Sequence, residues 1–509
     1  MARLTLNPYL LLATISALLI ANAVGQENHA KVLILGAGSA GIQAAATLHE
    51  NGEDDFIVIE GADYIGGRVK NANFSGYNVN VGAQWASPGG GSEFVDMMIR
   101  DWMIEGHEID VTSLVFRNTS GHEIPAAETD PIWGRIGAAI GRAAEIGQDI
   151  LDNDKQDVSQ RAALLDGGWF PKTALEKVIE WLSFDFATSE RTSVTSLLST
   201  IFSDYENDIH YITDPRGFAA IFDFIAPFIF QDEAFADHVR LNQVVTTVDY
   251  SNEDMVVVTC SDGTVYTADY AIVTFSLGVF QNEVIEYIPP LPNWKKWILS
   301  QFSVTYYTAI FLNFPERFWD NVETIMNVDE RYNYYPAFFN FDVFDNAPED
   351  AHILTTHILG DEALRVDQQS EEDTKTEIEV VLQKMYGLDE QPNATDFLIH
   401  SWLKDPLQLA GYCNWPVEVS RYDFPKLQER VGKIFFAGDS TDDVATGFVY
   451  GALRSGRREA MKVLECMNGG ECPQYEPSIE EEKACECSER PKSGKTRKDC
   501  SVATCVMRP

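Results

Sequence analysis

Residues 31–60 read KVLILGAGSAGIQAAATLHENGEDDFIVIE, and they indicate the fold class more clearly than any other segment. The run KVLILG is continuously apolar, as expected of a parallel strand that is buried on both faces. The segment from Ser39 to Asn51 is Ala-rich and reads as a helix, and FIVIE reads as a second buried strand. Strand, glycine turn, helix and strand in this order predict a βαβ unit.

The turn after the first strand carries the pattern G-x-G-x-x-G, formed by Gly36, Gly38 and Gly41. In a dinucleotide site the first glycine makes the tight turn, the second lets the backbone approach a pyrophosphate, and the third lets the helix pack close to the sheet. The helix N-terminus presents unpaired N–H groups to the phosphates. Glu60, at the end of the second strand, is placed to accept hydrogen bonds from a ribose, which disfavours an NADP-type ligand. The alternative is a glycine-rich turn that binds no ligand.

A second glycine turn, IGGRV at residues 65–69, favours FAD over NAD, because a longer dinucleotide continues past the first βαβ unit. It resembles the G-G-R turn of flavoproteins in the glutathione reductase and amine oxidase group. In that group an acid at the position of Asp439 reaches the ribityl-phosphate region, and a helix starting near Gly447 points its positive end at the flavin. FAD is therefore the predicted cofactor. The residues expected to bind it are Gly36, Gly38, Gly41, Glu60, Arg68, Gly82, Ala83, Gln84, Trp85, Val244, Trp402, Gly438, Asp439, Gly447, Phe448 and Val449.

The chain has 509 residues, which is too long for one compact core, so at least two domains are expected. Helical patterns fill most of residues 90–230, and strand patterns return at 239–274. We predict an α/β plus α+β chain, in which a Rossmann-type FAD-binding domain contains an inserted substrate domain with a mixed sheet and helices. The expected boundaries are 31–95, 235–285 and 425–465 for the FAD-binding domain, and 96–234 and 286–424 for the substrate domain.

The stretch VTYYTAIFLNF, residues 304–314, predicts a further strand because it is rich in β-branched and aromatic residues. Side chains alternate between the two faces of a strand. Tyr307, Ala309 and Phe311 are therefore expected on one face, and Ile310 and Leu312 on the other. Ala309 is the one small side chain in the run.

The N-terminus predicts secretion. An apolar stretch from Leu10 to Ala23 ends in an A-x-A pattern, which indicates a cleaved signal peptide at residues 1–23. A non-cleaved anchor is the alternative, and no later run approaches the length of a membrane span. Glycosylation sequons at Asn73, Asn118 and Asn393 agree with an extracellular protein.

The net charge of −40 argues against nucleic acid or an anionic membrane as a partner. It would favour cationic ligands through long-range steering, although a solvated acidic surface explains it equally well. We expect a monomer and no metal site.

The cysteines are distributed unevenly. Cys260 and Cys413 stand alone, whereas the other cysteines crowd the C-terminal tail, residues 466–509. In a secreted chain such a cluster indicates disulfides, with a zinc knuckle as the alternative. The members of the cluster are Cys466, Cys472, Cys485, Cys487, Cys500 and Cys505.

Several late motifs resemble one enzyme family. They are SLGVFQ at 276–281, PPLPNWKKWI at 289–298, FLNFPERFW at 311–319, NWPV at 414–417 and FAGDST at 436–441. Their order and spacing are similar to those of the flavin-containing amine oxidases, and most of all the secreted polyamine oxidases. The resemblance runs from about Lys31 to Leu464. It implies an FAD domain and a substrate domain with a six-stranded sheet flanked by helices.

The chemistry that the resemblance implies is oxidation of a C–H bond next to an amine nitrogen, with O2 reduced to hydrogen peroxide. The amine must lose its proton first, so an apolar, aromatic-walled site helps. Tyr412 and Phe448 match the aromatic pair that stands over the flavin. From the sequence alone, the tryptophans Trp85, Trp402 and Trp415 are also read as packing residues.

The match fails at Ala309. The family strand has a lysine here, which holds a water against flavin N5. Two carboxylates that hold a polyamine in plant relatives are also replaced, by Ser87 and Ala187, although Asp185 and Glu93 lie close in the sequence. Three functions stay open: oxidation of a polyamine or related secondary amine, oxidation of another amine or specialised metabolite, and flavin binding with impaired catalysis.

Overall fold

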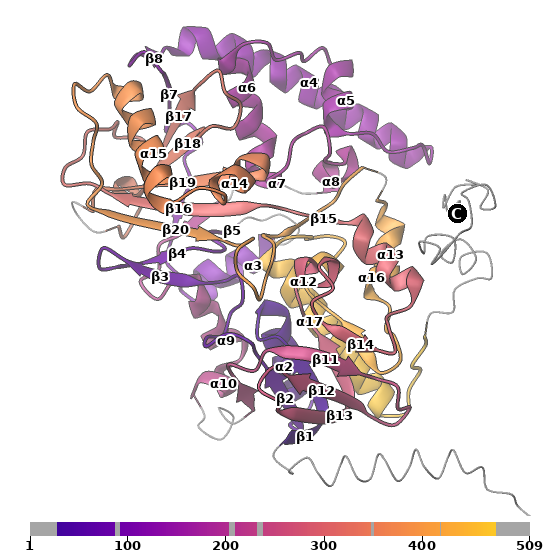
Figure 1. Cartoon of the computed structure of the whole chain (residues 1–509). Coiled ribbons are helices and arrows are strands. Elements are labelled where there is room, and N and C mark those ends of the chain that lie inside the picture. Colours follow the sequence, from indigo (N-terminus) through magenta and orange to yellow (C-terminus); the bar gives the residue numbers. More distant parts are fainter. Residues whose placement is uncertain are drawn as a thin grey trace, which may run out of the picture.

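The structure is a computed structural model that describes residues 28–86, 92–202, 209–231, 238–347, 351–417 and 419–474. The predicted signal peptide and the tail cysteines beyond Cys472 lie outside these residues. An eight-stranded sheet forms one half of the molecule, and a seven-stranded sheet forms the other. In Figure 1 the half with the eight-stranded sheet lies below the half with the seven-stranded sheet. No helix of the described residues has the length and apolarity that crossing a membrane requires.

The eight-stranded sheet is built around the opening stretch. Its first strand β1 (His29–Leu35) lies between β2 (Phe56–Ile59) and β13 (Val265–Val273) and runs parallel to both. Alternate residues of β1 enter two apolar clusters on opposite faces, which explains the continuous apolar run. The remaining strands are β10 (Val239–Arg240) beside β2, then β12 (Val256–Cys260), β11 (Val245–Asp249) and β14 (Glu286–Ile288) beyond β13, with β22 (Ile434–Phe436) parallel to β13.

Two helices cover one face of this sheet. They are α2 (Ser39–Glu50) and α17 (Val449–Met467), and both contribute to the same apolar cluster. They pack closely, because a Cβ added at Gly456 would lie 2.0 Å from the carbonyl oxygen of Ala40. The arrangement confirms the predicted Rossmann-type fold.

The seven-stranded sheet belongs to the second half of the molecule. Its order is β20 (Asp396–Ser401), β16 (Tyr307–Asn313), β19 (Ile353–Leu359), β18 (Ala337–Asn340), β17 (Thr324–Val328), β7 (Leu114–Asn118) and β8 (Glu123–Ile124). The resemblance predicted six strands, and the short β8 adds a seventh at one edge. Helices pack on this half: α4 (Ala126–Asp152), α5 (Gln160–Asp166), α6 (Ala174–Glu180), α14 (Gly360–Val366) and α15 (Glu371–Tyr386).

The strand predicted at 304–314 is divided in two. β15 (Ser303–Val304) pairs with β21 (Cys413–Asn414), and the longer β16 begins only at Tyr307. Within β16 the predicted alternation is confirmed. Tyr307 and Ala309 enter the cluster shared with Trp85 and Trp402, whereas Ile310 enters the cluster shared with α15.

Small sheets and short helices complete the chain. The sheets are β3 (Asn71–Phe74) with β4 (Tyr77–Asn80), and β5 (Trp85–Ala86) with β9 (His210–Ile212) and β6 (Gly106–Glu108). The helices are α3 (Ser92–Asp96), α7 (Phe186–Thr188), α8 (Leu197–Phe202), α9 (Phe222–Ile225), α10 (Pro227–Gln231), α12 (Leu277–Gln281), α13 (Asn293–Gln301), α16 (Phe424–Gln428), and the π-helices η2 (Met97–Asp101) and η3 (Trp181–Asp185). A disulfide joins Cys466 to Cys472, so the cluster contains a disulfide as expected, although the sequence left the pairing open. Cys260 and Cys413 are free buried thiols.

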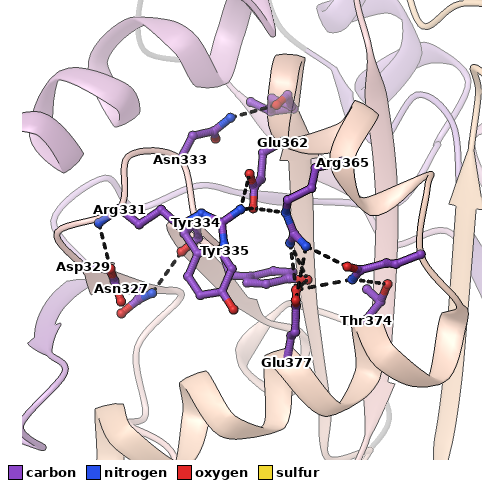
Figure 2. A network of polar contacts seen from close by, with 12 residues as sticks. Asn327, Asp329, Arg331, Asn333, Tyr334, Tyr335, Glu362, Arg365, Thr374 and Glu377 are labelled. Carbon is purple, nitrogen blue, oxygen red and sulfur yellow. Dashed lines mark hydrogen bonds and ion pairs between the residues drawn. The ribbon is translucent and has the colours of Figure 1, made fainter.

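A polar network ties α14 to α15 (Figure 2). Arg365 donates to Glu362 at 2.7 Å and to Glu377 at 2.7 Å. Tyr335, which is fully buried, donates to the same Glu377 at 2.8 Å. None of these residues lines the large cavity described next.

Candidate active site

A cavity of about 740 Å³ is lined by segments of both halves of the molecule. The glycine turn after β1, the end of β22 and the start of α17 contribute from the eight-stranded side. Tyr307 of β16 and Phe339 of β18 contribute from the seven-stranded side. Of the residues predicted to bind the cofactor, only Gly41 does not line this cavity.

The glycine turn has the geometry that its sequence predicted. Gly36 has φ +111°, a conformation that favours glycine. A Cβ at Gly41 would lie 1.9 Å from the Gly36 carbonyl oxygen, so this glycine serves helix packing. At Gly38 the nearest atom to an added Cβ is the Gly67 Cα at 3.9 Å, which leaves the backbone open to the cavity.

Glu60 lines the cavity and is buried. Its carboxylate accepts the backbone N–H groups of Ala37 at 2.7 Å and Ala62 at 2.8 Å. Burial raises the pKa of Glu60, and these backbone donors oppose that shift. Each carboxylate oxygen can accept more than one hydrogen bond, so acceptor capacity is left for a ribose.

Arg68 and Asp439 contact each other. The Arg68 guanidinium lies 2.5 Å from the Asp439 carboxylate and also donates to the Gly411 carbonyl. Asp439 in turn accepts the Cys413 N–H at 3.1 Å. This ion pair therefore joins three segments of the cavity wall that lie far apart in the sequence.

The segment 81–85 forms another wall. A Cβ at Gly82 would lie 1.8 Å from the Arg68 carbonyl oxygen and 3.0 Å from the Trp402 ring. Trp402 is held by its indole N–H, which donates to Val81 at 3.2 Å. Ala83 and Val244 also line the cavity.

Gln84 provides the test of whether a large polar ligand fits. It is 1% exposed and lines the cavity, yet neither its amide nitrogen nor its amide oxygen has a hydrogen-bond partner among the described residues. Buried polar groups are nearly always hydrogen-bonded. An unpaired amide in the same cavity wall as the open glycine turn and the Glu60 carboxylate fits a dinucleotide such as FAD.

The start of α17 meets the cavity. Gly447, Phe448 and Val449 line it, and Phe448 is the N-cap residue of the helix. Gly447 has φ +84°. The positive end of the helix dipole therefore lies at the cavity wall, as the resemblance implied.

The predicted aromatic pair, Tyr412 and Phe448, lies in the cavity wall. A Cβ at Gly447 would lie 3.3 Å from the Tyr412 ring, so the two members come from segments in contact. The Tyr412 hydroxyl lies 2.6 Å from the Ser189 hydroxyl, which fixes the ring orientation. Trp85, Trp402 and Trp415 line the cavity too, so the reading of these tryptophans as packing residues was incomplete.

Ala309 is fully buried and does not line the cavity. Tyr307, two residues earlier on the same face, does so instead, and sequence reasoning missed it. Its ring centroid lies 6.3 Å from that of Tyr412. The alternation of the strand was the available signal, because it places Tyr307 beside Ala309.

Of the two carboxylates considered from the sequence, the structure describes the side chain of Asp185 alone. Asp185 is buried on η3, accepts a hydrogen bond from Tyr332 and does not line the cavity, whereas Ala187 does. Burial raises the pKa of Asp185 to about 7. Ser87 and the Glu93 side chain lie outside the described residues. The part of the wall away from the glycine turns is mostly apolar: Ile109, Val111, Leu114, Trp133, Leu182 and Phe186.

Comparison with known proteins identifies the family. The family model of the flavin-containing amine oxidoreductases matches residues 39–464. The chain belongs to this family. It is accordingly an FAD-dependent amine oxidase, and FAD is its cofactor.

Individual relatives agree with this assignment. Polyamine oxidase 1 of Zea mays is 31% identical over 503 residues, covering 92% of this chain and 98% of that protein. Lysine-specific histone demethylase 2 of Homo sapiens is 27% identical over 463 residues, covering 86% of this chain and 54% of that protein. The structure of wild-type putrescine oxidase bound to putrescine superposes with a TM-score of 0.68 at 20% identity, covering 86% of this chain and 99% of that one, which shows a shared fold.

Proposed function

We propose that this amine oxidase oxidises a polyamine or a related secondary amine to an imine, which hydrolyses to an aldehyde, while O2 is reduced to hydrogen peroxide. The observation that carries the proposal is the single cavity that brings the glycine turns, the start of α17 and the pair Tyr412 and Phe448 together. FAD, when bound, supplies the hydride acceptor.

The side chains of this protein would orient the amine. Tyr412 is held by Ser189, and an aromatic ring fixed in this way can pack against the substrate chain next to the reacting nitrogen. The aromatic and apolar wall disfavours the ammonium form, so it promotes the neutral amine that oxidation requires.

A second candidate substrate class is an amine with a bulky apolar arm. The apolar wall at Ile109, Leu114, Trp133 and Phe186 favours it, because such a wall gains from burying hydrocarbon and gives nothing to a second ammonium group. This candidate corresponds to the alternative in which the pocket has changed its substrate.

An amine panel tests the two candidates. Purified, FAD-loaded protein is assayed for peroxide with spermine, spermidine, their N-acetyl forms, and aromatic or long-chain secondary amines. Oxidation of the polyamines at the highest kcat/KM supports the first candidate, and preference for the apolar amines supports the second. A flavin that every amine leaves oxidised would overturn both.

We also propose that the protein is secreted as a monomer and glycosylated. The N-terminal pattern at residues 1–23, the disulfide between Cys466 and Cys472, and the exposed positions of Asn73 and Asn393 support this. Expression in a eukaryotic secretory host tests it. The expected product begins at Val24, loses mass on treatment with a glycosidase and sediments as one chain. A product that stays in the cell with residues 1–23 attached would contradict the proposal.

A further inference from the structure

Two histidines flank Ala309 across the seven-stranded sheet. β16 runs antiparallel to both of its neighbours, and in these registers Ala309 lies opposite His357 of β19 and His400 of β20. Residues opposite one another in antiparallel strands share a face, with Cβ atoms about 4.5–5.5 Å apart. Both imidazoles therefore lie beside the position where the resemblance predicts a lysine.

His357 contacts the cavity wall through Tyr307. The Tyr307 hydroxyl lies 2.7 Å from Nδ1 of His357, and the two rings stack with centroids 5.5 Å apart and an interplanar angle of 18°. Tyr307 lines the cavity, whereas His357 does not. The imidazole is thus one layer behind the wall, and its hydrogen bond to a residue of the wall is the one to the Tyr307 phenol.

The surroundings of His357 are aromatic. Its ring lies 4.9 Å from Trp85, 5.4 Å from Phe339 and 6.3 Å from Phe186, measured between centroids, and the residue is 1% exposed. Burial lowers the pKa of His357 to about 3. The imidazole is therefore neutral near pH 7, and one of its two nitrogens carries the proton.

The hydrogen bonds of the two ring nitrogens differ. Nε2 of His357 has no hydrogen-bond partner among the described residues, and Nδ1 has Tyr307. A buried N–H without an acceptor is rarer than a buried acceptor without a donor. With the proton on Nε2, the donor without an acceptor is a buried N–H of a residue that does not line the cavity; with the proton on Nδ1, it is the phenol of Tyr307, which lines the cavity where a ligand can accept from it. We therefore assign the proton to Nδ1, which donates to the Tyr307 oxygen. Burial raises the pKa of Tyr307, so the phenol keeps its own proton and can donate it elsewhere.

We propose that His357 is a positioning residue that holds Tyr307 as a neutral hydrogen-bond donor in the cavity wall, at the place where this chain lacks the family's lysine. A donor that itself accepts a hydrogen bond is polarised and donates more strongly. Unlike an ammonium group, it adds no positive charge to a site that must admit an amine. The inference rests on the amine oxidase activity of the family and not on which amine is the substrate.

Nuclear magnetic resonance tests the proposed tautomer without any amine. In FAD-loaded protein labelled with ¹⁵N-histidine, the His357 signals are expected to show a protonated Nδ1 and an unprotonated Nε2 at pH 7. Tyr307→Phe, which removes only the hydroxyl, should shift the His357 signals and thereby identify them. His400→Gln is the matched control, because it should leave the His357 signals in place. A proton on Nε2, or a doubly protonated ring, would overturn the proposal.

Stopped-flow reduction by the best amine tests the consequence. Tyr307→Phe and His357→Phe should each slow flavin reduction about tenfold, the effect of losing one hydrogen bond of about 1.4 kcal/mol, and the double variant should be no slower than either. His357→Asn, whose amide N–H reaches the place of Nδ1, should retain more of the rate than His357→Gln.

The two proposals fail in different ways. Additive effects of the two substitutions, or a His357→Phe rate equal to that of the wild type, would contradict the positioning role. If no amine on the panel is oxidised, the substrate proposal fails, while the resonance experiment still decides the tautomer. If His357→Phe does not fold, the wild type and Tyr307→Phe are sufficient for that experiment.

Discussion

Tyr335 and Tyr307 are two buried tyrosines in the same half of the molecule, and their surroundings differ. The Tyr335 hydroxyl belongs to a closed network in which Arg365, Glu362 and Glu377 use one another as partners (Figure 2). Among the residues that the structure describes, the Tyr307 hydroxyl has one hydrogen-bond partner, His357, and Tyr307 lines the cavity. A polar cluster that satisfies itself stabilises the fold, whereas one with unused donors or acceptors indicates a place for a ligand.

The largest effect is expected at the cavity. Gly38→Asp should abolish FAD retention, because a carboxylate at the open turn would crowd and repel the pyrophosphate. The purified variant should show no flavin absorbance while its circular dichroism stays that of a folded protein. Gly134→Asp is the matched control, since Gly134 is exposed on α4 with no atom within 4 Å of an added Cβ. Normal flavin content in Gly38→Asp would contradict the cofactor site.

A substitution in the closed network around Arg365 should lower the stability of the fold and leave the flavin content unchanged. Arg365→Met removes one partner of Glu362 and one partner of Glu377, and should lower the free energy of unfolding by about 2–3 kcal/mol, the usual effect of losing hydrogen bonds to charged groups. Urea denaturation measures it. Arg142→Met, which breaks two exposed ion pairs, should change this quantity much less, because exposed ion pairs contribute little to stability. An altered flavin spectrum in Arg365→Met would show that the network of Tyr335 also affects the cofactor site, and would contradict the proposed difference between this network and the cavity wall at Tyr307.

The pH dependence of stability provides the next test. The pKa of His357 is about 3 in the folded chain and about 6.5 when unfolded, so between these values the unfolded state binds the extra proton. The contribution of His357 is therefore complete above pH 6.5 and is lost as the pH falls. From pH 7 to pH 5, His357→Phe should lose about 2 kcal/mol less of its unfolding free energy than the wild type. Equal losses would show that His357 is accessible to protons in the folded state.

The sequence predicted the glycine turn and Glu60 better than it predicted the pair of Tyr307 and His357. The turn at Gly36 and Gly41 and the acid Glu60 form one local βαβ unit, so their relation follows from spacing. The pair of Tyr307 and His357 depends on the register between β16 and β19, which lie far apart in the chain, and no local pattern determines that register. The division of the strand before Tyr307 was missed for a similar reason, because β15 pairs with β21 whereas β16 pairs with β19 and β20.

The smallest effect is expected at Ala309 itself. Ala309→Lys restores the cation that the family resemblance predicts, and should speed flavin reoxidation by O2 only a few fold, a change of about 1 kcal/mol in the barrier, because Tyr307 already supplies a donor at this wall. Ala309→Met is the matched control, since it adds similar length without charge. In the Tyr307→Phe background the gain from the lysine should be larger, because the competing donor is gone. If Ala309→Lys increases the reoxidation rate equally in both backgrounds, the lysine and Tyr307 act independently. Tyr307 then does not perform the role of the lysine that this chain lacks.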